Sequence, residues 1–311
     1  MYIIRGLSNI PGKFRGAAAT IGNFDGVHLG HQSLFHELDH LAAPHGAPVM
    51  AITFEPHPMR LVNPAMAPPR ITGVRGKSRW MSRFGVDAMF ILPFTHLLAA
   101  LTPRAFVEEI LVGGLALKEV LVGTNFHFGC HGSGNFDVLR ELGRHFGFGV
   151  HQRELLNLDG EVISSTRVRE VVHNRDFSLA ARLLGHHFEI EGRVGHGHHR
   201  GRSLGFPTAN LNLNGLLHPP PGVYIVEGRT EEGWLPGVAN VGGNPTFGET
   251  EPHLEVHFLR PCGNLYRKVM RIRFHEFLRE QIAFPSPSEL MRQIARDIAR
   301  AEAMFAALEG D

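Results

Sequence analysis

A glycine-rich strand-to-helix turn constrains this chain more than any other feature. It occupies residues 20–31, which read Thr-Ile-Gly-Asn-Phe-Asp-Gly-Val-His-Leu-Gly-His, and we call it the glycine-histidine turn. The small and apolar residues at 17–21 are typical of a buried strand, and residues 32–41 carry leucines at helical spacing. Glycines let backbone N–H groups close on a phosphate, and a helix N-terminus adds partial positive charge. The turn therefore predicts polyphosphate chemistry and not a metal cage.

The turn also contains two histidines, His28 and His31, which are three residues apart. On a helix this spacing is about one turn, so both side chains can point at one anion. The phosphate-contacting residues expected around them are Gly22, Asn23, Phe24 and Gly30. The alternative is an ordinary glycine turn with two solvated histidines. The glycine placement, the histidine spacing and the strand-helix context agree, so we favour the phosphate site.

Strands and helices alternate through the rest of the first half. Strands are expected within residues 1–15 and at 48–54, 88–92, 119–123 and 151–156, and helices at 75–84, 103–111 and 136–146. Pro103 after Thr102 is typical of a helix start. This alternation favours a doubly wound parallel sheet with helices on both faces. Ligands of such sheets bind outside the carboxyl ends of the strands.

Three more clusters fall at those strand ends. The first is the rigid Phe-Glu-Pro-His-Pro segment at 54–58, and the second, at 122–129, places Gly and Asn between aromatic residues. The third, at 163–172, begins Ile-Ser-Ser-Thr-Arg and is typical of a helix N-terminus. Each has an ordinary structural interpretation: a turn, a loop that covers the core, and a helix cap. The second cluster also suits a planar ring with a polar edge.

In this order, the four motifs resemble the prokaryotic-type FAD synthetase module of the nucleotidyltransferase superfamily, over most of residues 15–185. The resemblance implies transfer of AMP from ATP to FMN, which gives FAD and pyrophosphate. It implies that His28 and His31 stabilise charge on the ATP phosphates and that Mg²⁺ offsets the rest. It assigns the departing phosphates to Ser165, Thr166 and Arg169, and the flavin nucleotide to Phe54, Pro56, Pro58 and Asn125. The chain departs from the family at His131, where a basic residue is usual, so binding there is expected to weaken above neutral pH.

The residue pattern changes after position 185. Residues 188–194, 223–227, 254–259 and 269–274 alternate with period two between Gly and Pro turns, which predicts an antiparallel β-barrel. One terminal helix is expected at 288–308, with apolar residues at helical spacing. We therefore predict two domains, at residues 1–185 and 186–311.

The chemical candidate in the second half is the Pro-Thr-Ala-Asn segment at 207–210. In an extended segment Thr208 and Asn210 face the same way, and their oxygens suit one hard cation such as Mg²⁺ with ATP phosphates. An exposed turn is the commoner interpretation of such a segment alone. The surrounding motifs favour the site, and they lie at residues 195–201, 222–224 (Gly-Val-Tyr), 240–242 (Asn-Val-Gly) and 245–247 (Pro-Thr-Phe).

These motifs resemble the riboflavin kinase domain over nearly all of residues 186–311. The resemblance implies that Glu255 acts as the base toward the riboflavin 5′-hydroxyl, with Glu251 as a rival, and that the γ-phosphate of ATP is transferred. The loop from Gly195 to Gly201 is rich in histidine. We favour an ATP-phosphate loop there, and a metal site remains the alternative.

Composition limits the remaining classes of function. The net charge of +1 gives no strong nucleic-acid or membrane signal, and neither a signal peptide nor a bilayer-spanning run is expected. The two cysteines lie in different halves, which fits a reducing cytoplasm. The expected ligands are riboflavin, FMN, FAD, ATP and Mg²⁺, and the oligomeric state stays open. The alternatives are a chain with one live activity, or a flavin-binding or nucleic-acid-binding protein without catalysis.

Overall fold

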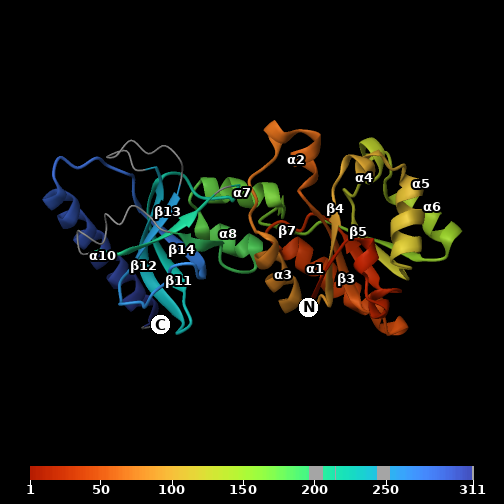
Figure 1. The fold of residues 1–311 in the computed structure, drawn as a ribbon, viewed down its shortest axis with the longest axis horizontal. Helices are drawn as coiled ribbons and strands as arrows, with labels where there is room; N and C mark the ends of the chain where they lie inside the picture. The colour runs from red at the N-terminus through yellow and green to blue at the C-terminus, as the bar shows by residue number, and fades with distance from the viewer. Residues whose placement is uncertain (196–205, 214, 244–252, 310–311) are drawn as a thin grey trace. The chain divides into compact units, whose positions relative to one another are not determined.

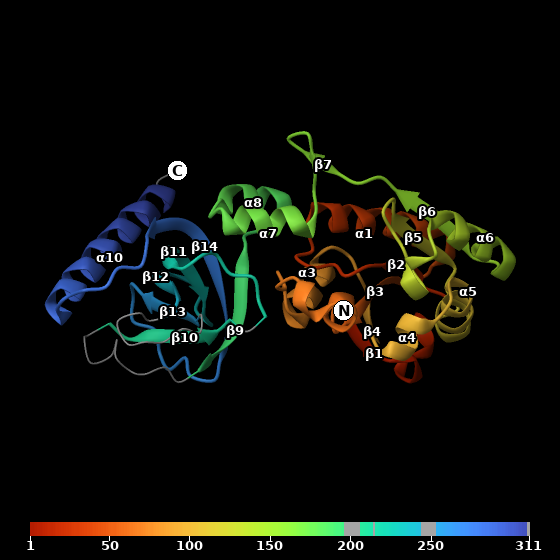
Figure 2. The same ribbon diagram turned by 90° about the horizontal axis from the view of Figure 1, so that it is seen from above.

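The computed structural model describes residues 1–195, 206–213, 215–243 and 253–309. The chain divides into two compact units. The N-terminal unit comprises Met1–Pro69 and Val74–Ser165, and the C-terminal unit comprises Arg70–Gly73 and Thr166–Asp311. Figures 1 and 2 show the elements of each unit from two directions.

The N-terminal unit is built on a parallel six-stranded sheet. Its strands are β1 (Tyr2–Arg5), β2 (Ala18–Ile21), β3 (Val49–Glu55), β4 (Ala88–Pro93), β5 (Glu119–Gly123) and β6 (Gly149–Arg153). The spatial order is β1-β4-β3-β2-β5-β6, and every neighbouring pair runs parallel. From β2 the chain builds β3 and β4 on one side and β5 and β6 on the other. The switch point of the sheet, where ligands bind in such folds, therefore lies between β2 and β5.

Helices cover both faces of this sheet, as the alternating pattern predicts. The helices α1 (Leu29–Ala42) and α3 (Val74–Arg83) pack on one face, where Phe35, Leu38, Trp80 and Met81 are buried against Ala51 and Met89. The other face is covered by α5 (Pro103–Phe106), the π-helical segment η5 (Val107–Gly114) and α6 (Phe136–Phe146). Figure 2 shows these two layers on either side of the strands.

Shorter elements connect these layers. They are the helices α2 (Pro58–Val62) and α4 (His96–Ala100), the hairpin β7 (Asn157–Leu158) and β8 (Glu161–Val162), and single turns at Leu7–Asn9, Gly12–Phe14, Ala43–His45, Pro64–Met66 and Cys130–Gly132.

Two elements of the N-terminal unit differ from the sequence-based expectation. The strand expected at 151–156 is β6, which begins at Gly149 and ends at Arg153, because its parallel partner β5 ends at Gly123. The helix expected at 103–111 begins as predicted, with the Thr102 hydroxyl accepting a bond from Ala105 N at 3.1 Å. It then widens into η5, which continues to Gly114.

The C-terminal unit is a closed antiparallel barrel with helices. Its strands are β9 (Glu189–Gly195), β10 (Thr208–Asn212), β11 (Gly222–Arg229), β12 (Trp234–Gly242), β13 (His253–Phe258) and β14 (Val269–Arg279), in the order β10-β13-β12-β11-β14-β9. The terminal helix α10 (Pro287–Glu309) packs Ala301 and Phe305 against β11 and β14. The predicted fold class, a doubly wound sheet followed by a barrel and a helix, is confirmed.

Two helices that lie between β8 and β9 in the sequence belong mostly to the C-terminal unit. They are α7 (Ser165–His173) and α8 (Phe177–Leu184). Phe177 is buried, and its ring lies 5.5 Å from that of Phe274 and 6.3 Å from that of Phe188 inside the barrel. The division by packing thus falls in the first turn of α7, between Ser165 and Thr166. The predicted boundary at 185 stays a proposal for where the two catalytic modules meet.

Among the described residues, no helix is both long enough and apolar enough to cross a membrane.

Candidate active sites

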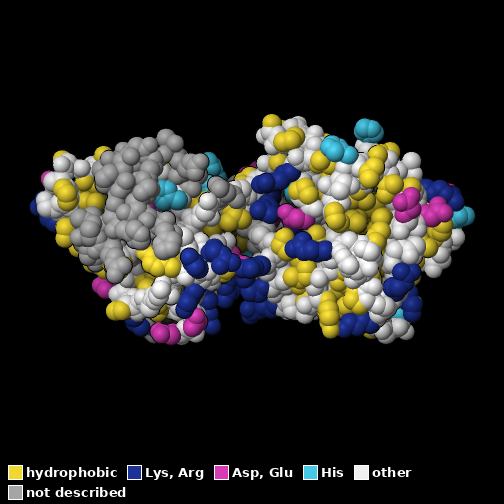
Figure 3. Space-filling view, viewed as in Figure 1, with side chains coloured by type: hydrophobic (Ala, Val, Ile, Leu, Met, Phe, Trp, Pro, Cys, Tyr) yellow, Lys and Arg dark blue, Asp and Glu magenta, His cyan; other side chains and the backbone are white. Residues whose placement is uncertain are grey.

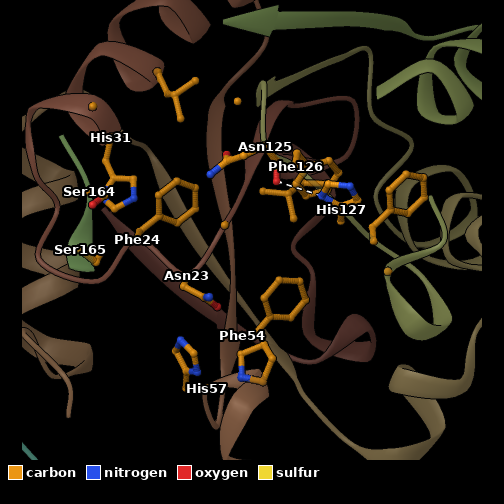
Figure 4. Close-up of a pocket in the computed structure, with 18 of the residues that line it drawn as sticks. Asn23, Phe24, His31, Phe54, His57, Asn125, Phe126, His127, Ser164 and Ser165 are labelled. Carbon is orange, nitrogen blue, oxygen red and sulfur yellow. Dashed lines mark hydrogen bonds between the residues drawn. The ribbon is translucent and has the colours of Figure 1, made fainter. Parts of the chain in front are cut away.

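A cavity of about 940 Å³ opens at the carboxyl ends of the central strands in the N-terminal unit. The glycine-histidine turn, the loop after β3 and the loop after β5 form its walls, so it lies at the switch point of the sheet. Figure 4 shows the labelled side chains around it. Ten of the predicted site residues line it: Gly22, Asn23, Phe24, His28, Gly30, His31, Phe54, Pro58, Asn125 and Ser165.

The two histidines of the turn lie face to face. Their ring centroids are 3.6 Å apart with an interplanar angle of 20°, and Phe24 packs edge-on to His31 at 5.2 Å. His28 is the residue that precedes α1, so both rings lie beside the first backbone N–H groups of a fourteen-residue helix. Those N–H groups have no acceptor within the helix and carry partial positive charge. The predicted convergence of two imidazoles on one anion site is thus possible in this geometry.

His31 is poorly placed to carry a positive charge in the free protein. Desolvation lowers its pKa well below the usual value, and the nearby His28 and the Lys77 ammonium lower it further. A neutral imidazole donates one hydrogen bond and accepts another. His31 therefore contributes a neutral N–H rather than a permanent cation.

Buried polar side-chain atoms of the turn lie at the cavity without a hydrogen-bond partner in the described part of the chain. The Nδ1 atom of His31 and the Oδ1 atom of Asn23 are buried and have no hydrogen-bond partner among the described residues. Buried polar atoms are nearly always bonded in proteins, so unpaired ones at a cavity indicate that a bound molecule completes them.

Two residues of the turn take a backbone conformation that residues other than glycine rarely adopt. Phe24 and Val27 have φ angles of 48° and 46°, in the left-handed region. At Gly22 a Cβ atom would lie 3.2 Å from the Phe24 ring, and at Gly30 it would lie 3.1 Å from the His28 ring. A side chain at either position would therefore force the neighbouring ring to shift by a few tenths of an ångström. Such backbone strain persists only where the surroundings fix it.

Four hydrogen bonds fix the turn from neighbouring elements. Gly22 N donates to Ile52 O on β3 at 3.0 Å. The carbonyl of Asn23 accepts from Thr53 Oγ1 at 3.2 Å and from Lys77 Nζ at 2.8 Å. The hydroxyl of Ser165 donates to Asp25 O at 2.8 Å. This last bond occupies the only donor hydrogen of Ser165, the side chain predicted to hold a departing phosphate.

Sequence reasoning misses Lys77. This lysine is almost fully buried at 6% exposure, on the face of α3 that also buries Trp80 and Met81. A usable signal is present in the sequence, because Lys77 falls at helical spacing among apolar residues. A lysine is almost never buried without a partner.

Aromatic side chains make up the rest of the cavity wall. Phe54 meets Phe94 edge-on at 5.7 Å, and Phe126 stacks on Phe128 at 5.5 Å. Asn125 lies beside Phe126, and the backbone carbonyl of Asn125 accepts a hydrogen bond from His127 Nδ1 at 3.1 Å (Figure 4). An apolar slot with a few polar atoms is typical of a site for a planar ligand.

Some predicted residues fall elsewhere. Pro56 is exposed and is absent from the cavity lining, although the adjacent His57 and Pro58 line it. Thr166 and Arg169 belong to the C-terminal unit, on α7. His131, at which the sequence departs from the family resemblance, does line the cavity.

The rim of the cavity includes exposed apolar residues. Val62 on α2 lines the cavity and is 66% exposed. Leu97 on α4 is 84% exposed and lies next to Leu98, which lines the cavity. Figure 3 shows apolar side chains on the surface over the α2 segment of the N-terminal unit.

The barrel brings the predicted kinase residues into one row. Asn210 on β10 pairs with Gly195 on β9 and with Glu255 on β13, and Glu255 pairs with Asn240 on β12. Residues directly opposite in an antiparallel pair point to the same face. The interleaved Ala209, Leu211, Leu254 and Val256 fill the barrel interior, so this polar row faces outward.

Thr208 lies two positions from Asn210 on the same face, as predicted. Asn210 Nδ2 is 3.4 Å from Thr208 Oγ1, and Glu255 Oε1 is 3.2 Å from His253 Nε2. Asn240 Oδ1 accepts from Gln281 Nε2 at 2.8 Å, which fixes the far end of the row. Hydroxyl, amide and carboxylate oxygens side by side are the ligand set that Mg²⁺ prefers, so the residues present fit this ion.

Part of this second site lies outside the described residues. That part includes Gly201, the histidine-rich residues 196–200 and the rival base Glu251. Within the described ranges, no group of three or more His, Cys, Asp or Glu side chains is arranged to hold a metal ion.

Comparison with known families matches both halves of the chain. A family model described as FAD synthetase matches residues 11–167, and one described as riboflavin kinase matches residues 184–305.

Curated relatives match nearly the full length. The bifunctional riboflavin kinase/FMN adenylyltransferase of Pseudomonas fluorescens is 42% identical over 98% of this chain and 98% of its own length. The protein of the same name from Escherichia coli strain K12 is 40% identical with the same coverage.

A solved structure supports the arrangement of the fold. A Streptococcus pneumoniae protein described as a macrolide-efflux protein superposes with a TM-score of 0.82 at 26% identity, over 97% of this chain and 99% of that one.

Proposed function

The chain belongs to the family of bifunctional riboflavin kinase/FMN adenylyltransferases, and from that premise we propose which residues carry each reaction. The protein phosphorylates riboflavin to FMN and adenylylates FMN to FAD, with ATP as the second substrate of both reactions. We assign FAD formation to the cavity of the N-terminal unit and FMN formation to the polar row on the barrel.

In the N-terminal cavity, an oxygen of the FMN phosphate attacks the α-phosphorus of ATP. The new bond joins the two phosphates of FAD, and the bond to the β-phosphate oxygen breaks as pyrophosphate leaves. His28 and His31 donate N–H bonds to the phosphate oxygens, beside the N-terminus of α1. Catalysis then depends on positioning and charge stabilisation, without a covalent enzyme intermediate. The unpaired polar atoms of His31 and Asn23 at this cavity carry the proposal.

The aromatic wall of the cavity is the proposed flavin side. Phe54 and Pro58 offer apolar surface to the ring system, and Asn125 offers an amide to its polar edge or to the FMN phosphate. Ser165 reaches the phosphates after giving up its bond to Asp25 or through its backbone. Thr166 and Arg169 stay in the proposal as phosphate ligands on the family resemblance alone.

On the barrel, Glu255 is the proposed base that removes the proton of the riboflavin 5′-hydroxyl. The resulting oxygen attacks the γ-phosphorus of ATP, and ADP leaves. Thr208 and Asn210 would hold Mg²⁺, which when bound offsets part of the polyphosphate charge. Gly195 pairs with Asn210 and begins the proposed ATP loop. The proton on Glu255 then passes to solvent, because its side chain is about one quarter exposed.

Two substitutions test the separation of the sites. His28→Ala is expected to lower the kcat of FAD formation from FMN about 10²- to 10³-fold, because a donor to the developing charge is lost. It should leave FMN formation from riboflavin unchanged. Glu255→Gln is expected to do the reverse, with a loss of about 10²- to 10⁴-fold in FMN formation.

The measurement is product analysis by chromatography after feeding riboflavin or FMN with ATP and Mg²⁺. Loss of both activities in either folded variant would contradict the separate sites. If the wild-type chain made FAD from FMN but no FMN from riboflavin, only the adenylyltransferase would be active.

We also assign these reactions to the cytoplasm. Cys130 and Cys262 both keep free thiols, which supports a reducing compartment.

A further inference from the structure

The buried ammonium of Lys77 lies against the backbone of the glycine-histidine turn. Its Nζ donates to the carbonyl of Asn23 at 2.8 Å, and only 6% of the residue is exposed. Burying an ammonium is costly unless it is bonded, so this position has a physical cause. The proposed reaction uses neither Lys77 nor the Asn23 carbonyl.

We propose that Lys77 is a positioning residue for adenylyl transfer, which holds the glycine-histidine turn through the carbonyl of Asn23 and sets the local positive potential beneath its histidines. This inference rests on the proposed function of that turn. Lys77 lies on α3, whereas His28 precedes α1 and His31 lies in its first turn. Lys77 therefore links two elements that are far apart in sequence.

The backbone beside the Lys77 hydrogen bond is strained. Phe24 follows Asn23 directly and has a φ of 48°. A backbone conformation of this kind is unfavourable and relaxes if nothing opposes it. Lys77 Nζ and Thr53 Oγ1 both donate to the Asn23 carbonyl and hold the peptide group in place. A shift of about 1 Å in a positioned group can lower a rate about 100-fold.

The charge of Lys77 also affects the protonation of the histidine pair. The Lys77 ammonium is one of the causes that lower the pKa of His31, together with burial and His28. Asp25 is the buried carboxylate of the same turn, and His57, Arg153 and Glu154 line the same cavity. With Lys77 charged, the turn attracts polyphosphate while His31 stays a neutral donor.

The test compares Lys77→Met, which keeps the length and removes the charge, with Lys77→Arg, which keeps the charge. Lys118→Met is the matched control, because Lys118 is an exposed lysine of the same unit. Each variant is assayed as the full chain for FAD formation from FMN and for FMN formation from riboflavin. The titration of the His31 ring is followed by NMR.

Lys77→Met is expected to lower the kcat of FAD formation about 10- to 100-fold and to raise the pKa of His31. FMN formation should be unchanged in the same preparation. Lys77→Arg should restore part of the rate and keep the pKa of His31 low, and Lys118→Met should match the wild type. Normal FAD formation by Lys77→Met, or an unchanged His31 titration in that variant, would overturn the proposal.

Thr53→Val provides a second, milder variant in case Lys77→Met does not fold. It removes the other donor to the Asn23 carbonyl and should lower kcat several-fold. If Lys77→Met folds, the effects of Thr53→Val and Lys77→Met should not multiply in the double variant, because both act through one carbonyl. An unchanged kcat in Thr53→Val, or independent effects in the double variant, would refute the anchoring role.

His28→Ala, assayed in parallel, separates this inference from its premise. If His28→Ala makes FAD normally, the proposed function of the turn fails. If it abolishes FAD formation while Lys77→Met does not, only the role of Lys77 fails.

Discussion

His31 has a buried ring nitrogen, a lowered pKa and a proposed contact with phosphate. Its ring stacks on His28 at 3.6 Å, and its Nδ1 atom is buried. A charged imidazole there would be desolvated beside the Lys77 ammonium, so the free protein favours the neutral form. The negative charge of an incoming polyphosphate acts in the opposite direction, because it favours the protonated ring. The same residue therefore responds both to substrate and to pH.

The lowered pKa of His31 predicts that acid destabilises the N-terminal unit. Above about pH 6.5 His31 is neutral in the folded and unfolded states, and its contribution to stability is fully present. As the pH falls below this value, the unfolded chain takes up the proton first. The free energy of unfolding then drops, by at most about 1.4 kcal/mol per pH unit for one group.

Urea unfolding at several pH values between 5 and 8 measures this contribution as the difference between the wild type and His31→Gln. The wild type should lose more stability on acidification than the variant. Parallel curves for the two proteins would contradict the predicted titration.

At the scale of elements, one buried ion pair fastens the terminal helix to the barrel. Asp297 on α10 is 6% exposed and accepts bonds from Arg279 on β14, with Nη2 at 2.8 Å and Nε at 3.1 Å. Gln293 Nε2 donates to the same carboxylate at 2.9 Å. The apolar stripe of α10 buries Ala301 and Phe305. Arg300 on α10 adds an exposed ion pair with Glu276 on β14 at 2.7 Å, so both charged and apolar contacts hold the helix.

Asp297→Ala is expected to destabilise the barrel by about 3–5 kcal/mol, because Arg279 keeps its charge in a partly buried site without its partner. The control is Glu231→Ala, which breaks an exposed pair with Lys268 and should change the free energy of unfolding very little. Thermal or urea unfolding measures both. Equal small effects would show that the buried pair contributes no more than a surface pair.

At the scale of the whole molecule, the chain divides by packing at a different place from the change in sequence pattern. The pattern changes after residue 185, whereas α7 and α8 pack with the barrel. Phe177 is 4% exposed among the barrel aromatics, and Arg175 bonds Glu280 at 2.6 Å. The two helices therefore contribute to the stability of the unit that carries the kinase residues.

A fragment of residues 166–311 is consequently expected to unfold at a higher temperature than a fragment of residues 186–311. Loss of a buried Phe contact costs about 3–5 kcal/mol in other proteins. Calorimetry of both fragments, with riboflavin phosphorylation as the activity readout, measures the difference. If the shorter fragment were equally stable and active, the helices would be dispensable and the boundary at 185 would be supported.

Local sequence patterns predict much of the fold and most of the proposed site residues that line the N-terminal cavity. Parallel strands bury both faces, so their apolar runs are visible in sequence, and the loops that follow them must meet at one edge. This is why Gly22, Phe54 and Asn125 line one cavity, as predicted. The strand β12 was not identified, because Pro236 and Gly237 interrupt its alternation while its neighbours β11 and β13 still pair with it.

The sequence by itself determined the two folds, the glycine-histidine turn and the alternation that puts Thr208, Asn210 and Glu255 on one face, because each depends on residues close together in the chain. Only the tertiary structure decided that Glu255 lies opposite Asn210 and that α8 packs with the barrel. It alone brought Lys77 against Asn23, across 54 positions of sequence. Strand register and the burial of a charge depend on which distant segments meet, and no local pattern records that choice.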